Sequence, residues 1–463
     1  MGGPLREVAD PRTRNQTDMK SETRYQAAST AREGHATKWW VLFLLTLVYT
    51  VNIADRYVVS TLIEPIKHEF RLSDSEVGFM TGTAIALFYV TLSLPLGLLA
   101  DRVNRKRMIS VALAVWSGFT VLCGTSSTAL TFFLSRIGVG IGEAGCMPCA
   151  VSLLADKFSP PMRGTAMSLF SVGAAVGALM GSSGGGWIAE QHGWRAVLLV
   201  FGCLGMPLVA ILLLGFREPP RGVFDKPDSA TSRAGLKETL RHIRDCKALF
   251  HAIAGTTVLT FWGWGLVWWT PSFLVRSFHL GVGGAGEILG AIHGIGGGLA
   301  MLGTALVLSR PRAASSFAQA RLVALVTALA TIPSFVAYAS TSLPVTHLML
   351  WVFVPTIYVY IGPSASMAQN LTPAPMRGQV IGIIVFVTNV ANLVIAPQAI
   401  GFLSDVISPH LSNPAESLRY VLVLVSLTGL WAAWHFYLAG RHMRAGEADQ
   451  SFSTIHGTPV RGS

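Results

Sequence analysis

Long apolar segments separated by short polar stretches run along most of the chain. A helix needs about 20 apolar residues to cross the hydrocarbon core of a bilayer. Two groups of six such segments can be placed, with a longer polar stretch between the groups. The predicted spans are 38–60, 76–100, 106–126, 129–153, 163–190, 195–216, 248–276, 284–308, 319–341, 344–370, 377–405 and 417–440. The pattern predicts an all-α polytopic membrane protein with twelve transmembrane helices.

The polar segments divide the chain into five parts. These are a tail at 1–37, a six-helix bundle at 38–216, a linker at 217–247, a second six-helix bundle at 248–440 and a tail at 441–463. The first tail is basic and poor in large apolar residues, so we expect it to be disordered, and no cleavable signal peptide is predicted. Within the linker, the run 236–243 is basic and amphipathic, which makes it a candidate for a helix on the membrane surface.

Composition and charge fit a membrane protein better than a soluble one. Hydrophobic residues make up 51% of the chain and charged residues 13%, whereas a soluble domain carries roughly 25% charged residues. In a soluble protein the net charge of +11 would suggest nucleic acid as a partner. Here most of the 35 lysines and arginines fall on one side of the membrane if both termini are cytoplasmic, as the positive-inside rule requires. We therefore expect a multi-pass protein of the cell membrane with cytoplasmic termini and no nucleic-acid partner.

The two halves of the chain resemble each other. The tetrapeptide Pro-Met-Arg-Gly occurs at 161–164, before the fifth predicted span, and again at 375–378, before the eleventh. At the other ends of those spans, Gly-Trp-Ile-Ala-Glu at 186–190 corresponds to Gly-Phe-Leu-Ser-Asp at 401–405. The shared orientation of the copies implies two parallel six-helix repeats, which usually enclose a substrate site near the bilayer midplane.

A charged motif lies between the second and third predicted spans. It consists of Gly97, Asp101, Arg102, Arg105 and Arg107. This pattern resembles the loop signature of the major facilitator superfamily, which has glycine where this chain has Asn104. Asparagine tolerates a left-handed backbone, so we expect it to replace that glycine. A carboxylate adds nothing to topology, whereas at a helix end it can hold one conformation and release it in the other. The motif therefore predicts a cytoplasmic gate.

Four charged side chains interrupt the apolar spans: Asp55 and Arg56 in the first span, and Arg136 and Glu143 in the fourth. Such groups are costly in a membrane and usually face the protein interior or water. They could form a static network that holds the first half together, or a proton-responsive site. Burial favours a neutral acid whereas a nearby arginine favours a carboxylate, so separating a pair would move a proton. We predict Glu143, and after it Asp55, as proton-coupling groups. Arg56 and Arg136 would pair with them or receive an anionic substrate group.

The second half is aromatic where the first is charged. The candidate cavity residues are Asn52 in the first half and Trp262, Trp264, Tyr358, Thr388, Asn389 and Asn392 in the second. Trp268 and Trp269 fit either a cavity wall or the aromatic belt at a membrane interface. A cavity that is charged on one side and aromatic on the other suits an amphipathic substrate.

Within the superfamily, the chain is most similar to the spinster group. The residues that carry this resemblance are 52–57 (Asn-Ile-Ala-Asp-Arg-Tyr), the charged motif at 97–107, 140–144 (Gly-Ile-Gly-Glu-Ala) and 159–164 (Ser-Pro-Pro-Met-Arg-Gly). The resemblance implies transport of lysosphingolipid-like or lysophospholipid-like molecules, as in animal relatives. The compact loops and short tails look more like those of a prokaryotic member, whose substrate can differ.

Several functions can be compared on this basis. One is a proton-linked carrier of amphipathic lipids that works by alternating access; another is an exporter of drugs or other small molecules. A membrane enzyme would need a nucleophile–base pair or a metal constellation, and the spans contain no such motif. A scaffold would not need charges inside the membrane. The chain has no phosphate-binding loop, so uphill transport must use an ion or substrate gradient. We expect no enzymatic activity, no cofactor, no metal and a monomeric state.

Overall fold

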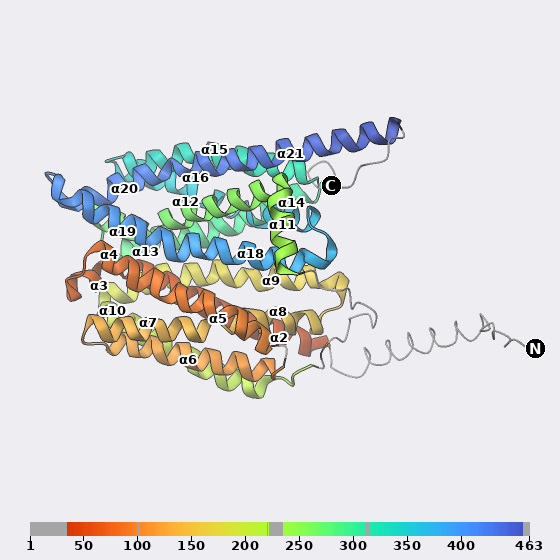
Figure 1. Ribbon diagram of the computed structural model, residues 1–463. Coiled ribbons are helices and arrows are strands. Elements are labelled where there is room, and N and C mark those ends of the chain that lie inside the picture. Colours follow the sequence, from red (N-terminus) through yellow and green to blue (C-terminus); the bar gives the residue numbers. More distant parts are fainter. Residues whose placement is uncertain (1–34, 101, 220, 222–234, 311–314, 457–463) are drawn as a thin grey trace, which may run out of the picture.

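The computed structural model describes residues 35–100, 102–219, 221, 235–310 and 315–456, and its regular structure is entirely helical (Figure 1). Nine helical segments in this described part are long and apolar enough to cross a membrane. One of them, Met162–Gly215, holds two predicted spans, divided where Gly193 adopts a left-handed φ of 80°. The second and seventh predicted spans are also helical, so the structure is consistent with twelve transmembrane helices.

The helices fall into two halves. The first contains α2 (His35–Thr61), α3 (Ile63–Phe70), α4 (Asp74–Gly78), η1 (Phe79–Thr83), α5 (Ala84–Ala100), α6 (Arg105–Thr125), α7 (Ala129–Glu143), α8 (Cys146–Lys157), α9 (Pro160–Leu179), η2 (Met180–Gly184) and α10 (Gly185–Gly215). After the linker helix α11 (Leu236–Asp245), the second contains α12 (Lys247–Phe278), α13 (Val282–Ala291), η3 (Ile292–Gly297), α14 (Gly298–Leu308), α15 (Ser316–Ala339), α16 (Leu343–Thr356), α17 (Ile361–Asn370), α18 (Arg377–Asn389), η6 (Val390–Ile395), α19 (Ala396–Ile407), α20 (Ser417–Ser426) and α21 (Thr428–His456).

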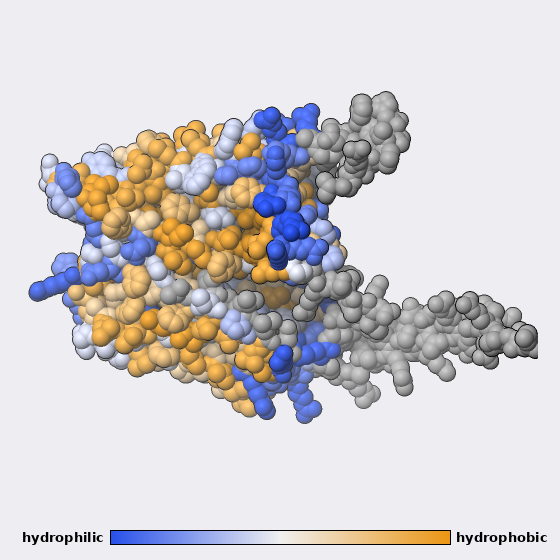
Figure 2. Space-filling view, in the orientation of Figure 1, coloured by the Kyte–Doolittle hydropathy of each residue, from blue (hydrophilic) through white to orange (hydrophobic). Residues whose placement is uncertain are grey.

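The surface matches a protein that sits in a bilayer. Apolar side chains cover the middle of the molecule and hydrophilic ones gather at its two ends (Figure 2). Leu214, Leu299 and Leu348 are all at least 60% exposed, which lipid tolerates and water would penalise. We call the end that carries α11 and the start of α2 the basic end, and the opposite end the far end.

Each half has its own hydrophobic core. Trp116, Phe132 and Phe170 are buried in the first, and Trp262, Phe353 and Phe436 in the second. Large buried aromatic side chains dominate the energy of packing because each removes much apolar surface from its surroundings. The cores meet at Ile63 and Val77 of the first half, which pack in the core of the second, and are otherwise separate, so each half can move as a body relative to the other.

The two repeats carry π-helical segments at equivalent positions where the halves meet. In the part of the chain that the structure describes, π-helical segments occur at η1, η2, η3 and η6. These segments belong to the second and fifth helices of each repeat, and η2 packs on α13, η3 on α9, and η1 on η6. Such segments are rare and frequently mark functional sites. The two repeats therefore bring equivalent, locally widened helices to their common boundary.

Three predicted spans, 129–153, 344–370 and 417–440, are each made of two consecutive helices, and the third of them divides between α20 and α21 at Leu427. The first breaks between α7 and α8, where Gly145 follows the end of α7 at Glu143. The second breaks between α16 and α17, directly after Pro355. Glycine and proline both weaken a helix, the first through backbone entropy and the second by removing a donor.

The halves are held together at the far end by ion pairs. Arg276, at the end of α12, donates to Glu64 Oε1 at 2.7 and 2.9 Å and to the two carboxylate oxygens of Asp74 at 2.6 and 2.8 Å. Lys67 also pairs with Asp74, and the hydroxyl of Ser404 donates to it at 2.7 Å. Asp74 begins α4 of the first half, so these contacts join both repeats.

Each repeat also places a carboxylate over the start of a helix in the other repeat. Asp405 accepts hydrogen bonds from the backbone N–H groups of Asp74 at 2.9 Å and Ser75 at 2.7 Å. Glu190, its counterpart in the sequence repeat, lies over the start of α13, where a Cβ atom on Gly283 would fall 1.9 Å from its carboxylate. Helix N-termini favour negative charge, so both contacts stabilise a closed far end.

We expect this closure to persist in mild acid. Burial alone would raise the pKa of the Asp74 carboxyl, but the hydrogen bonds and charge of Arg276, and then the charge of Lys67, hold that pKa well below its usual range. A carboxyl with a depressed pKa contributes stability above its unfolded pKa and loses it only as the pH falls through the folded value. An ordinary aspartate titrates near pH 4, so closure should be constant from neutral pH to about pH 5.

This pH dependence can be measured as the distance between spin labels at Arg71→Cys and His410→Cys, two exposed far-end positions in different halves. The distance should not change over that range. Opening of the far end between pH 7 and about pH 5 would contradict the assignment, because an ordinary carboxyl is still ionised there.

Candidate functional site

A buried ion pair lies in the first half, beside the boundary between the repeats. Arg56 on α2 donates to Glu143 Oε2 through Nε at 3.0 Å and Nη2 at 2.7 Å. The side chain of Glu143 is 1% exposed and that of Arg56 is 23% exposed. The other oxygen of Glu143, Oε1, has no hydrogen-bond partner among the described residues. The pair therefore has one buried member and one that reaches a more open space.

A second ion pair lies deeper in the same half. Arg136 on α7 donates from Nη1 to Asp55 Oδ2 at 3.2 Å, and the hydroxyl of Thr120 on α6 donates to Asp55 Oδ1 at 3.0 Å. The side chains of Arg136 and Asp55 are 1% and 3% exposed. The four charged residues predicted from the sequence thus form two distinct pairs that differ in exposure.

Close packing of α9 and η2 on α2 fixes the helix that carries two of these charges. A Cβ atom at Gly177 would lie 2.5 Å from the carbonyl oxygen of Thr50, and one at Gly181 would lie 2.4 Å from that of Ala54. Only glycine allows this approach. The contact brings the backbone of η2 directly against the turn before Asp55.

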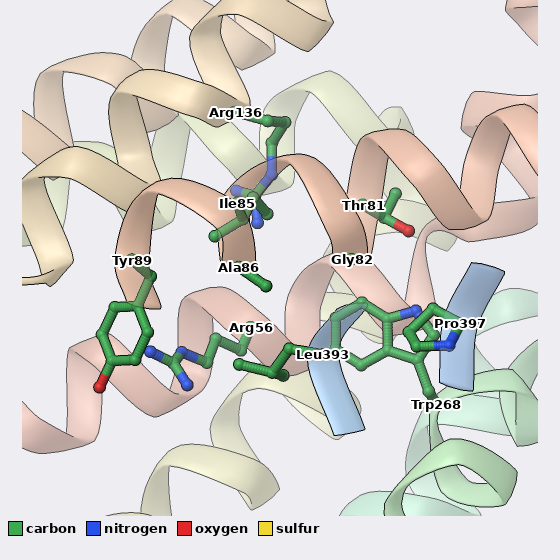
Figure 3. Close-up of a pocket in the computed structure, with 10 residues that line it drawn as sticks. All are labelled: Arg56, Thr81, Gly82, Ile85, Ala86, Tyr89, Arg136, Trp268, Leu393 and Pro397. Atoms are coloured by element: carbon green, nitrogen blue, oxygen red, sulfur yellow. The ribbon is translucent and has the colours of Figure 1, made fainter. Parts of the chain in front are cut away.

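A narrow pocket, with a cavity volume of about 20 Å³, opens between the halves beside these pairs (Figure 3). Its first-half wall is formed by α2, η1, α5 and α7, and its second-half wall by α12, η6 and α19. The guanidinium of Arg56 faces the ring of Tyr89 at 4.8 Å from its centroid, as Figure 3 shows. Trp268 lines the opposite side, and its indole N–H has no partner among the described residues. The pocket therefore joins positive charge to aromatic surface.

An aromatic cluster bridges the halves next to this pocket. The hydroxyl of Tyr358 lies 2.8 Å from Nδ1 of the buried His293 and 3.5 Å from the hydroxyl of Tyr57, which follows Arg56 on α2. The ring of Trp264 stacks on that of His293, and its indole donates to Tyr360 at 3.3 Å. Tyr358 and Trp264, two of the predicted cavity residues, are thus brought together at the boundary.

The other predicted cavity residues are placed differently. Trp262 is 1% exposed and packs against Phe353 in the core of the second half, so it does not reach the boundary. Asn52 is buried in α2, one turn before Arg56. The remaining three, Thr388, Asn389 and Asn392, are half-buried at the junction of α18 and η6, just before the pocket residue Leu393.

The predicted gate is described in part. Asp101 lies outside the described residues, Gly97 lies within α5, and Arg102 and Arg107 are exposed. Arg105 is buried and joins three elements of the first half: it pairs with Asp156 on α8 and with Glu218 after α10, at 3.0 Å. These contacts all lie within the first half, so Arg105 does not join the two halves at the basic end.

Asn104 does not use the left-handed backbone that asparagine tolerates. Its φ of −65° and ψ of 111° are extended, and its side chain accepts a hydrogen bond from the backbone N–H of Arg107 at 2.8 Å. Asparagine is among the best residues at the N-cap of a helix. The residue at this position therefore starts α6 instead of bending the loop.

Several residues of the site were not found from the sequence. Tyr89, Thr120 and His293 were not singled out as site residues, and Trp268 was left between a cavity and a membrane belt. The signal for Tyr57 was present, because it directly follows Arg56. The others depend on which face of a helix meets the opposite half, which a uniformly apolar span does not reveal.

This architecture defines a membrane transporter: two helical repeats enclose a charged and aromatic pocket that is closed at one end. The chain belongs to the major facilitator superfamily, whose sequence model matches residues 45–397.

Relatives support the same class. An "MFS-type efflux pump" of Mycolicibacterium smegmatis is 27% identical over 89% of this chain and 95% of its own length. Protein spinster homolog 1 of Xenopus tropicalis is 25% identical, covering 84% of this chain and 78% of its own length. A crystal structure of a bacterial homologue of the human lysosomal transporter Spinster, inward-facing and unoccupied, has a TM-score of 0.77 at 25% identity, covering 88% of this chain and 98% of that one. The resemblance to the spinster group is confirmed.

Proposed function

We propose that this protein is a secondary active transporter that works by alternating access and moves an amphipathic, lysolipid-like or sphingosine-phosphate-like substrate with the help of protons. It would act as a monomer in the cell membrane with both termini cytoplasmic. Transport then alternates between the closed far end seen here and a state closed at the basic end.

The observation that carries this proposal is the pocket between the halves. One wall presents the guanidinium of Arg56, which suits a phosphate or carboxylate head group. The other presents Trp268, Leu393 and Pro397, which suit an apolar chain. A molecule with an anionic head and an apolar tail would satisfy both walls at once.

Proton coupling would arise from competition for Arg56. An anionic substrate and the Glu143 carboxylate cannot both hold the same guanidinium at full strength. If the substrate takes Arg56, Glu143 loses its counter-charge inside a buried site, and binding a proton removes the cost of that unpaired charge. Release of the substrate restores the ion pair and expels the proton. Substrate movement and proton movement would thereby be linked through one side chain.

The gate residues have a place in the same cycle. Arg105 stabilises the first half through Asp156 and Glu218 in the state described here. We propose that Arg102 and Arg107, with Asp101, contact the second half when the basic end closes. The side chains of Arg102 and Arg107 are exposed in the present structure and so are available for such contacts.

The test uses purified full-length protein in liposomes with a fluorescent lysolipid or sphingosine-phosphate analogue, with and without a pH gradient. We expect the gradient to accelerate movement by the wild type and to have no effect on Glu143→Gln. The matched control is Glu287→Gln, the same change at an exposed carboxylate, which should keep the acceleration. Movement that ignores the gradient in the wild type would overturn the coupling, and no movement by folded protein would overturn the lipid substrate.

A second candidate is export of drugs or other small molecules. It is favoured by the similarity to the efflux pump of Mycolicibacterium smegmatis, which extends over nearly the full length of both chains. In the same liposomes, movement of an apolar cation such as ethidium without movement of the lipid would support this function. The arginine-lined wall argues for the anionic lipid, because it repels a cationic drug.

A further inference from the structure

The linker helix α11 runs crosswise to the long helices at the basic end (Figure 1). It is fixed to the second half at three places. The hydroxyl of Thr239 donates to Gln379 Oε1 at 2.7 Å, at the start of α18. Nε2 of His242 lies 3.0 Å from the carbonyl oxygen of Leu371, which follows α17. Cys246 alone separates α11 from α12. The helix is therefore held against the ends of three helices, at the level where the membrane surface would lie.

These contacts bury only part of the apolar face of α11. Thr239 and Ile243 are buried against the second half, at 0% and 9% exposure. Leu236 and Leu240 continue the same apolar stripe, because residues three and four apart share a helix face. They remain 59% and 50% exposed. The structure leaves two leucines at the edge of the contact with nothing packed over them.

Basic side chains lie directly beyond those leucines. At roughly 100° per residue, Lys237, Arg241 and Arg244 fall on the flank next to Leu236 and Leu240 and away from Ile243. All three are exposed, and Figure 2 shows strongly hydrophilic side chains at this helix. The pair between Arg244 and its neighbour Asp245 is solvent-exposed on both sides and holds the arginine only weakly.

We propose that α11 binds anionic phospholipid of the leaflet at the basic end. The leucines would enter the upper part of the acyl-chain region, and the three basic side chains would meet lipid phosphates. Buried contact face, apolar strip and basic strip follow one another around the helix in the order that a membrane surface requires. A soluble acidic protein would pair with the charges but would leave the leucines unexplained, so the lipid fits more of the surface.

Lipid binding at α11 would affect the pocket through the helices that α11 contacts. Its partners α12, α17 and α18 belong to the second half, and α12 and η6, which continues α18, line the pocket. Lipid that holds α11 at the surface therefore fixes the level of these helices in the membrane. This inference adds a lipid-dependent control to the transporter and does not depend on which substrate it carries.

The test compares full-length protein in nanodiscs of phosphatidylcholine with nanodiscs that also contain phosphatidylglycerol. The readout is hydrogen exchange of the backbone amides at 236–245. We expect slower exchange with phosphatidylglycerol, and loss of the difference at high salt because salt screens surface charge. In Lys237→Gln/Arg241→Gln/Arg244→Gln, the apparent affinity for phosphatidylglycerol should fall on the order of fivefold for each charge removed.

Two controls separate lipid binding from folding. The variant Lys237→Arg/Arg241→Lys/Arg244→Lys keeps the charges and should behave as the wild type. Glu238→Gln changes a charge on the side of α11 away from the leucines and should have little effect. Leu240→Ser should reduce protection while exchange in α12 and α18 stays unchanged. Equal exchange in both nanodiscs, or an unchanged response in the glutamine variant, would overturn the proposal. No substrate is used, so either result is independent of the proposed function.

Discussion

Gly286→Val is expected to open the far end. A Cβ atom at Gly286 of α13 would lie 2.3 Å from the carbonyl oxygen of Ser182 in η2, and this backbone cannot move without separating the halves. We expect separation of the halves to relieve this collision, so its cost should shift the balance towards the open state. Overpacking of a tight contact typically costs about 1–3 kcal/mol. Since about 1.4 kcal/mol is a factor of ten, the ratio of open to closed molecules should rise roughly 5- to 140-fold.

The measurement is the distance distribution between spin labels at Arg71→Cys and His410→Cys, on opposite halves of the far end. Gly78→Val should act in the same direction, because a Cβ atom there would lie 2.6 Å from the carbonyl oxygen of Pro397. Gly284→Val is the matched control on the same helix, since nothing lies within 4 Å of a Cβ atom at that position. If all three variants keep the distance of the parent, the tight contact does not govern closure.

The far-end contacts also show why part of the fold could be predicted from the sequence. The correspondence of Glu190 with Asp405 is visible in the chain, and both carboxylates lie over helix starts of the opposite repeat. Twelve apolar segments and the asymmetry of basic residues gave the helical architecture, because a bilayer imposes length and hydrophobicity on every span. The internal sequence repeat predicted that the two halves are parallel copies of one six-helix unit.

The breaks and the π-helical segments could not be predicted in the same way. Gly145 and Pro355 lie at breaks within predicted spans, whereas many other glycines and prolines in the described spans lie inside continuous helices. In lipid, a weakened helix is tolerated wherever neighbouring groups satisfy its backbone. Tertiary contacts therefore decide which candidates become breaks.

The candidate site could likewise be predicted from the sequence only in part. Charged residues in a span are rare and costly, so Asp55, Arg56, Arg136 and Glu143 stood out, and the structure brings all four into two ion pairs. Aromatic residues are common in spans, so their number hid which ones meet the opposite half. Trp262 went into a core, whereas Trp268 lines the pocket. The sequence therefore identified the site residues of a type that is rare in spans and missed those of a type that is common there.

The division into two pairs also assigns different roles to the carboxylates. The Asp55–Arg136 pair is almost fully buried and has further support from Thr120, although Arg136 also lines the pocket. The Glu143–Arg56 pair has a partner that reaches the pocket and the ring of Tyr89. Removing one member of a fully buried pair leaves an uncompensated charge and costs about 3–5 kcal/mol. The first pair should therefore be mainly structural and the second mainly functional.

We accordingly expect Asp55→Asn to lower the midpoint of thermal unfolding in detergent by on the order of 10 °C, at a few degrees per kcal/mol for a bundle of this size. Arg136→Gln should cost a similar amount, and the double variant Asp55→Asn/Arg136→Gln less than the sum, because the second change removes the charge stranded by the first. Glu143→Gln is the matched control and should lower the midpoint clearly less, since Arg56 keeps contact with Tyr89 and the pocket. Additive losses in the double variant, or an equal loss in Glu143→Gln, would show that burial does not separate the two pairs, and Asp55 would then stand beside Glu143 as a coupling group.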